Sequence, residues 1–242
     1  MFRKDVLGNL NLTKRLLFLL TGGLTYPNLV VFSKLHIEGA EILAELPRNN
    51  VLFVSNHQTY FADMIAIMHT MLSNAHRPGN FIGSPLYLLN PRLDIYYIAA
   101  EETMRSGFWP RLLACVGSIS VKRTWREAGQ DVARQVKLQD YSIIGQALQD
   151  GWVVTFPQGT TTPYAPGRRG TSFFIKQYRP IVVPIVLDGF REAFGKKGIR
   201  VRKRGMPLNL RFKSPMQIDY ENSHDVILDQ IMTAIEQKRP VE

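Results

Sequence analysis

The chain has 242 residues, 45% of them hydrophobic, and a formal net charge of +10 with a sequence pI near 9.8. This length and composition predict one large domain with a full core, or two small ones, and a single cysteine excludes an internal disulfide. The excess of positive charge indicates an anionic partner, which is nucleic acid, an anionic membrane surface or an anionic substrate.

The N-terminal segment is apolar but short. Lys14-Arg15 precede the run Leu16–Leu20, and a second apolar run covers Leu29–Phe32. Neither reaches the roughly 18 residues expected of a spanning helix, and Asp5 and the lack of a small-residue cleavage site argue against a signal peptide. Such a segment suits a membrane interface, and a helix docked on the protein's own core is an equal alternative. We expect a membrane-interface segment over 1–35 and a catalytic or binding domain over 36–242.

Apolar runs alternate with helix-like segments through the rest of the chain. The expected strands are Val51–Val54, Ile95–Ala99, Ile119–Val121, Trp152–Phe156, Ile181–Leu187 and Leu208–Phe212. The expected helices are Asp63–Leu72, Glu127–Gln149, Thr171–Gln177 and Ser223–Lys238, with Ser223 as an N-cap. This order predicts an α/β fold with a mostly parallel or mixed sheet flanked by helices. Functional sites in such folds collect in loops after the carboxyl ends of strands.

The first of these loops contains a histidine followed by a carboxylate. Asn56-His57 comes directly after a buried strand, and Asp63 lies six positions after His57. An imidazole takes up a proton near neutral pH, and a carboxylate partner fixes its tautomer. Most such pairs in proteins are structural, so the interpretation depends on the blocks that follow.

Three later blocks add polar groups at strand ends. Phe156-Pro157-Gln158-Gly159-Thr160 predicts a sharp turn that exposes backbone N–H groups and the side chains of Gln158 and Thr160. Gly117–Arg123 is a strand that runs into the two cations Lys122 and Arg123, which suit a phosphate. The apolar run Ile181–Gly189 contains Pro184, which predicts an edge strand, a wall of an acyl-chain slot, or both.

These blocks resemble those of the glycerolipid acyltransferases, the family that contains 1-acylglycerol-3-phosphate acyltransferase. Asn-His-x5-Asp, Gly-x-Ile-x-Val-x-Arg, Phe-Pro-x-Gly-Thr and Val-Pro-Ile-Val follow one another between Val51 and Gly189. The resemblance implies an α/β acyltransferase on a membrane surface that acylates a lysophospholipid hydroxyl. Acyl-CoA or acyl-carrier protein would be the co-substrate.

The resemblance also implies roles for individual residues. His57 would be the general base and Asp63 its orienting partner, and Pro184 would belong to the fourth block beside the acyl chain. The acceptor would be bound by the remaining site residues, namely Asn56, Lys122, Arg123, Pro157, Gln158, Gly159 and Thr160.

Two departures from the family pattern bear on these roles. The usual His-Asp spacing is one residue shorter, so the pair requires the extra residue to be absorbed in the loop before the helix at Asp63. The third block usually reads Phe-Pro-Glu-Gly-Thr-Arg, whereas this chain has Gln158 and Thr161. Arg168 and Arg169 are candidates to replace the missing guanidinium, and a lyso-aminolipid becomes a credible acceptor.

Other functions receive less support from the sequence. No histidine has metal-ligand spacing and no nucleotide-binding loop is present, so we expect no metal and no cofactor. The basic run Lys196–Arg204 lacks the interleaved aromatic residues of a nucleic-acid platform, and it suits anionic lipid or the phosphates of an acyl donor. We therefore expect a peripheral or monotopic protein on the cytoplasmic face of a membrane. The alternative is a lipid-binding homologue without catalytic activity.

Overall fold

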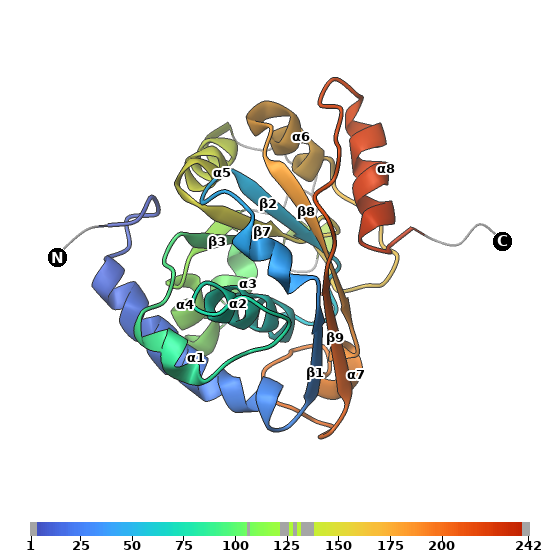
Figure 1. Cartoon of the computed structure of the whole chain (residues 1–242). Helices are drawn as coiled ribbons and strands as arrows, with labels where there is room; N and C mark the ends of the chain where they lie inside the picture. The colour runs from blue at the N-terminus through green and yellow to red at the C-terminus, as the bar shows by residue number, and fades with distance from the viewer. Residues whose placement is uncertain (1–3, 106, 122–125, 128–129, 132–137, 239–242) are drawn as a thin grey trace.

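The computed structural model describes residues 4–105, 107–121, 126–127, 130–131 and 138–238 (Figure 1). Its main sheet has seven strands in the spatial order β1-β9-β8-β2-β7-β3-β4. They are β1 (Lys34–Glu38), β2 (Val51–Ser55), β3 (Ile95–Ala100), β4 (Ser118–Val121), β7 (Trp152–Thr155), β8 (Ile181–Asp188) and β9 (Pro207–Phe212). A separate ribbon pairs β5 (Arg126–Glu127) with β6 (Gln130–Asp131).

Strand direction brings the candidate site together at one edge of the sheet. β8, β2, β7, β3 and β4 run parallel to one another, whereas β9 is antiparallel to β8, and β1 is parallel to β9. The sheet is therefore mixed, as the sequence predicts. Because β2 and β7 are parallel neighbours, the loops at their carboxyl ends, which begin with Asn56 and Phe156, start side by side.

Helices cover both faces of the sheet (Figure 1). One layer contains α1 (Asn11–Val30), α2 (Ala62–Asn74), η1 (Ala40–Ala44), η2 (Pro85–Leu89) and α7 (Phe190–Phe194). The other contains α5 (Leu138–Asp150), α6 (Arg169–Tyr178) and α8 (His224–Ala234), and α3 (Glu101–Arg105) and α4 (Phe108–Ala114) connect β3 to β4. Alternate residues of β2 enter different cores: Phe53 packs with the α2 layer, and Leu52 with the α6 and α8 layer.

The position of β8 corrects the expectation of an edge strand. β8 lies between β2 and β9, inside the sheet. The Pro184 carbonyl accepts the Lys213 N–H and therefore points toward β9. The nitrogen of a strand residue points to the same side as its carbonyl, so the missing N–H of Pro184 also faces β9. Because β9 ends at Phe212, next to this point, the sheet loses no ladder hydrogen bond there. Pro184 alternates with Val183 and shares its face with Val182, which packs with the α6 and α8 layer.

One other expectation changes in the structure, and two further features could not be predicted. Of the helix expected over Glu127–Gln149, the structure shows α5 from Leu138 to Asp150, whereas Glu127 belongs to β5. Residues 128–129 and 132–137 of that expectation lie outside the described residues. Cys115, the single cysteine, is exposed and follows the last turn of α4. The N-terminal segment forms one continuous helix through Pro27.

Helix α1 is docked on the protein's own core, which is one of the two alternatives from the sequence, and its role at a membrane interface stays a prediction. It buries Phe18 and Leu29 in the main core. On its other side it exposes a stripe of leucines, here called the α1 stripe, which comprises Leu12, Leu16, Leu19, Leu20 and Leu24. No helix in the described ranges is long and apolar enough to cross a membrane.

A buried lysine fixes the start of α1 to the sheet. Lys14 has no exposed side-chain surface, and its Nζ donates to Asp5 Oδ2 at 3.1 Å and to the Leu93 carbonyl at 2.5 Å. The amine also lies 4.5 Å from the centre of the Tyr96 ring. Burial lowers the pKa of Lys14 from its ordinary value, and the Asp5 carboxylate opposes that change.

Replacing Lys14 by methionine is expected to destabilise the fold. The Asp5 carboxylate and the Leu93 carbonyl would lose their shared donor in a buried place, which costs about 3 kcal/mol of unfolding free energy. Urea unfolding followed by circular dichroism measures this. The control is Lys34→Met, at an exposed lysine, which should change stability by less than about 0.5 kcal/mol. Equal stabilities of the two variants would contradict the account of Lys14.

Candidate active site

His57 and Asp63 form a hydrogen-bonded pair after β2. His57 Nδ1 lies 2.9 Å from Asp63 Oδ2. Asp63 is fully buried, whereas the His57 side chain is 15% exposed. Because an ionised carboxylate only accepts hydrogen bonds, Nδ1 carries the hydrogen and Nε2 keeps its lone pair. The pair thus has the orientation of a general base.

The long spacing between the two residues is absorbed in the loop. Helix α2 begins at Ala62, so Asp63 lies in its first turn and the residues from Gln58 to Phe61 are outside the helix. Asp63 Oδ2 accepts the backbone N–H groups of Gln58 at 2.5 Å and Thr59 at 2.9 Å, and Oδ1 accepts the Thr59 hydroxyl at 2.7 Å. The carboxylate therefore organises the loop as well as the imidazole.

Two side chains that flank His57 attach this loop to β8 and α7. Asn56 is buried and bridges the Leu187 backbone, donating to its carbonyl at 2.8 Å and accepting its N–H at 2.7 Å. Gln58 donates to the same carbonyl at 3.1 Å and accepts the Phe190 N–H at 2.8 Å. Asn56 was expected to contact the acceptor, but the structure places it behind the loop, where it positions His57. The role of Gln58 had no signal in the sequence.

The turn after β7 lies against the imidazole. The Phe156 ring stacks on His57 with centroids 4.0 Å apart and an interplanar angle of 22°. Gly159 has a φ of +62°, which glycine adopts without strain, and its N–H donates to the Phe156 carbonyl at 2.9 Å. Pro157, Gly159 and Thr160 line the same cavity as His57, and their contact with the acceptor stays a prediction.

Gln158 has a different environment from its neighbours in the turn. Its side chain donates to the Ala165 carbonyl at 3.0 Å and to Gln237 Oε1 at 3.1 Å. Gln237 Oε1 also accepts the N–H of Tyr164. Gln158 is 1% exposed and does not line the cavity. It therefore holds the loop that follows the turn, and the expected contact with the acceptor is not supported.

A cavity of about 560 Å³ is lined by His57 and by residues of several elements around it. On the α1 and α2 side its wall is mostly apolar and is formed by Phe18, Gly22, Phe61, Met64, Met68, Leu72, Leu88, Met104 and Leu113, with Thr21, Thr25 and His69 as polar members. Pro184 is not among the lining residues, because β8 presents it toward the opposite face of the sheet. The wall expected from β8 is thus formed by α1, α2 and the segment around α3 and α4.

The other side of the cavity lies at the start of α6 and combines polar residues with Phe173 and Phe174. Its polar part is formed by Thr160, Thr161, Arg168, Arg169, Thr171 and His224. Arg168 is the N-cap residue of α6 and its N–H donates to the Pro157 carbonyl at 2.8 Å. Burial lowers the pKa of Arg168 from its ordinary value. The Arg169 side chain is largely exposed and forms two hydrogen bonds with Asp225, at 2.8 and 2.6 Å.

A buried histidine, His69, connects three elements that line the cavity. His69 on α2 has Nε2 2.9 Å from the Thr25 hydroxyl of α1 and Nδ1 2.5 Å from the Tyr87 hydroxyl of η2. Burial lowers the pKa of His69 to about 4, so it is neutral at physiological pH. Its role is to hold α1 and η2 against α2, since no carboxylate is bonded to it.

Two expected site residues, Lys122 and Arg123, lie outside the described residues. Val121, the residue before them, lines the cavity. Among the described residues, no group of three or more His, Cys, Asp or Glu side chains is arranged to hold a metal ion.

Comparisons with known proteins agree with this geometry. The family model described as Acyltransferase matches residues 34–188, a range that contains β1 to β8 and both loops of the site. No curated protein matches the chain in sequence. The crystal structure of the 1-acyl-sn-glycerophosphate (LPA) acyltransferase PlsC from Thermotoga maritima has a similar fold, with a TM-score of 0.54 and 14% sequence identity over 92% of this chain and 77% of that one.

The position of Gln158 predicts the effect of restoring a carboxylate there. In Gln158→Glu, a buried carboxylate would face two oxygen acceptors, those of Ala165 and Gln237, and we expect a loss of about 3 kcal/mol of unfolding free energy at pH 8. Folding would raise the pKa of the new carboxyl group, so the loss should shrink as the pH falls toward 5 and the group is protonated. Gln158→Met is the control, with a smaller loss that does not depend on pH. Urea unfolding at both pH values measures this, and a Glu variant as stable as wild type at pH 8 would contradict it.

Proposed function

The chain belongs to the Acyltransferase family, and from this premise we propose that it transfers a fatty acyl group from an acyl thioester to the hydroxyl of a lysophospholipid such as 1-acylglycerol-3-phosphate. The observation that carries the proposal is the 2.9 Å contact between His57 Nδ1 and Asp63 Oδ2. This pair lies where an apolar cavity wall meets a polar one. An enzyme that joins a fatty chain to a polar lipid needs such a boundary next to its catalytic base.

The proposed mechanism uses His57 as a general base. Nε2 removes the proton from the acceptor hydroxyl as its oxygen attacks the thioester carbonyl carbon, and Asp63 stabilises the imidazolium that forms. The tetrahedral intermediate collapses by breaking the carbon–sulfur bond, and the imidazolium returns its proton to the thiolate. No acyl-enzyme is required, and general-base catalysis of this kind contributes roughly 10²- to 10⁴-fold to the rate.

The oxyanion of the tetrahedral intermediate requires hydrogen-bond donors near His57. The Gly159 N–H is already used within its turn, since it donates to the Phe156 carbonyl. Thr160 and Thr161 follow it and both line the cavity. We assign oxyanion stabilisation to this pair of residues, through their N–H or hydroxyl groups.

The two walls of the cavity suit the two parts of the substrates. The methionine- and leucine-rich wall between α1 and α2 suits the fatty chain, because it removes methylene groups from water. The wall at the start of α6 combines Arg168 with N–H groups that lack intrahelical partners, which together favour an anionic head group. Arg168 thus takes the place of the guanidinium that is absent at Thr161. That absence keeps a lyso-aminolipid as the second candidate acceptor.

We also assign the α1 stripe to a membrane surface. Its leucines face away from the core, and Leu86 and Leu89 of the adjacent η2 are exposed to 68% and 61%. Arg15 and Lys34 flank this apolar surface. Insertion of the stripe at the interface of an anionic membrane, on the cytoplasmic face, would bring lipid acceptors to the cavity without a spanning helix.

The catalytic assignment predicts which histidine is essential. His57→Ala should lower the rate of acyl transfer about 1000-fold, and Asp63→Asn about 100-fold, because one removes the base and the other weakens control of its tautomer. Product from lysophosphatidic acid and an acyl thioester is measured by mass spectrometry in detergent or anionic vesicles. His76→Ala, at an exposed histidine, is the control and should keep at least half of the activity. Full activity of His57→Ala in a folded protein would refute the mechanism, and a wild type that binds lipid but gives no product would favour a non-catalytic binder.

The head-group assignment predicts a difference between two adjacent arginines. Arg168→Gln should raise the KM for lysophosphatidic acid about 10-fold, the value of one charge-assisted hydrogen bond, and leave the KM for a lyso-aminolipid unchanged. Arg169→Gln should change the KM for lysophosphatidic acid by less than about 3-fold, since Arg169 is paired with Asp225 at the surface. Steady-state kinetics with both acceptors measures this, and equal effects of the two variants would contradict the assignment to Arg168.

A further inference from the structure

A strongly basic segment joins α7 to β9. It runs from Lys196 to Arg204 and is called the basic loop below. Six of its nine residues are cations, and all six are exposed: Lys196, Lys197, Arg200, Arg202, Lys203 and Arg204. None of the ion pairs seen in the described part of the chain uses any of them. The loop is therefore a surface of uncompensated positive charge.

The basic loop is attached directly to the catalytic loop. The Tyr60 N–H donates to the Lys196 carbonyl at 3.0 Å, and Lys196 Nζ lies 5.8 Å from the centre of the Tyr60 ring. Gly198, at a φ of +68°, approaches Thr59 so closely that an added Cβ would lie 2.5 Å from its Oγ1. Tyr60 also lines the cavity. The charge is thus fixed at the rim of the cavity, beside the segment that connects His57 to Asp63.

Strand order separates this charge from Arg168. The basic loop follows β8 and α7, the catalytic loop follows β2, and Arg168 follows β7. Because the sheet order is β8-β2-β7, the two cationic regions flank His57 on opposite sides. An acyl transfer reaction brings together two substrates with separate polar ends. One cationic region serves the acceptor head group, which leaves the other for the donor.

We propose that the basic loop binds the phosphorylated end of the acyl donor, through the phosphate groups attached to its pantetheine arm. This inference rests on the proposed function. With the acyl chain in the apolar cavity and the thioester at His57, the arm leaves past Tyr60 toward Lys196, where phosphates meet exposed cations. Acyl-CoA and acyl-carrier protein share this phosphopantetheine chemistry.

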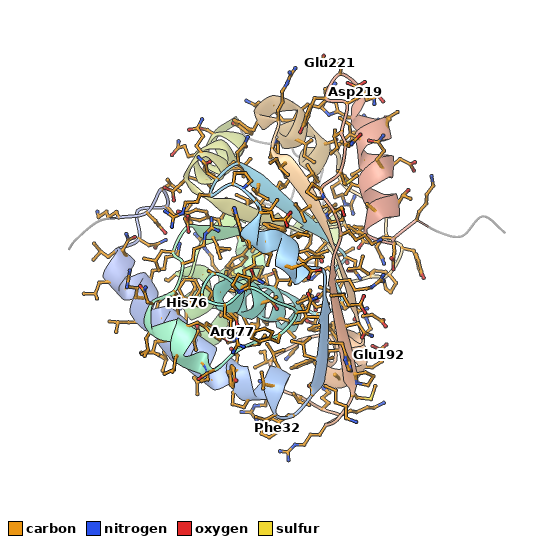
Figure 2. All side chains as sticks on the ribbon, in the orientation of Figure 1. Phe32, His76, Arg77, Glu192, Asp219 and Glu221 are labelled. Carbon is orange, nitrogen blue, oxygen red and sulfur yellow. The ribbon has the colours of Figure 1, made fainter. Side chains whose placement is uncertain are left out.

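The placement of the loop favours a donor over a lipid head group. Its N-terminal residues contact Thr59 and Tyr60 at the cavity rim, whereas the α1 stripe extends from Leu12 to Leu24, toward the N-terminal end of α1. The loop also contacts the C-terminal end of α1, where Asn28 Nδ2 donates to the Ile199 carbonyl at 3.5 Å. The Arg204 guanidinium lies 4.4 Å from the centre of the Phe32 ring, at the lower edge of the molecule (Figure 2). The acidic residues Asp219 and Glu221 lie at the opposite end (Figure 2).

The test compares donors with and without phosphate. The variant carries Lys196→Gln, Lys197→Gln and Arg200→Gln, and its control carries Arg48→Gln, Arg179→Gln and Lys238→Gln, which remove the same charge from exposed positions elsewhere. Acyl transfer is measured with acyl-CoA, with acyl-carrier protein and with unphosphorylated acyl-pantetheine. Binding of free CoA is measured by calorimetry in parallel, so that one readout does not require turnover.

We expect the variant to raise the KM for at least one phosphorylated donor 5- to 20-fold. If that donor is acyl-CoA, the affinity for free CoA should fall by a similar factor. The donor that is affected identifies its source. The KM for acyl-pantetheine should change by less than 2-fold, as should every value for the control.

Equal changes in KM for all three donors, or no change for any of them, would overturn the proposal. So would a loss of binding to phosphatidylglycerol vesicles with donor kinetics and CoA binding unchanged, which would assign the loop to lipid. If wild type transfers no acyl group, the proposed function fails, and loop-dependent CoA binding alone then decides this inference.

Discussion

The buried carboxylate of Asp63 accepts hydrogen bonds from the Gln58 and Thr59 backbone, from the Thr59 hydroxyl and from His57 Nδ1. A buried charge is costly unless its lone pairs are used, so these donors and the carboxylate require one another. The loop conformation, the tautomer of the imidazole and the direction of its free nitrogen follow from this one set of bonds. Asn56 and Gln58 then fix the loop to β8 and α7.

Parallel strands place everything else around that loop. β7 lies on one side of β2 and delivers Phe156 to the face of the imidazole and Arg168 to the polar wall of the cavity. β8 lies on the other side and delivers the basic loop to the rim at Tyr60. Helices α1 and α2 supply the apolar wall, and His69 holds them together. The order of three neighbouring strands therefore separates the regions assigned to acceptor, base and donor.

Local patterns in the sequence were enough for most of the elements and for the contact between His57 and Asp63. The buried runs predicted the central strands, and the extra residue before Asp63 was expected in the loop, where it is found. Roles that depend on distant contacts could not be predicted. Gln158 faces Gln237, 79 positions away, and the end of β9 lets Pro184 occupy an inner strand. The sequence could not decide whether α1 packs on the core or faces a membrane, because the helix buries one face and exposes another.

The tautomer of His57 tests the central claim most directly. The chain has five histidines, so ¹⁵N-histidine labelling gives a small set of signals, and His57→Gln identifies the one of interest. At a pH where His57 is neutral, the account predicts ¹⁵N shifts and couplings of a protonated Nδ1 and an unprotonated Nε2, with the pattern altered in Asp63→Asn. A neutral His57 with its hydrogen on Nε2 would contradict the account, because its cavity-facing nitrogen could not then accept a proton.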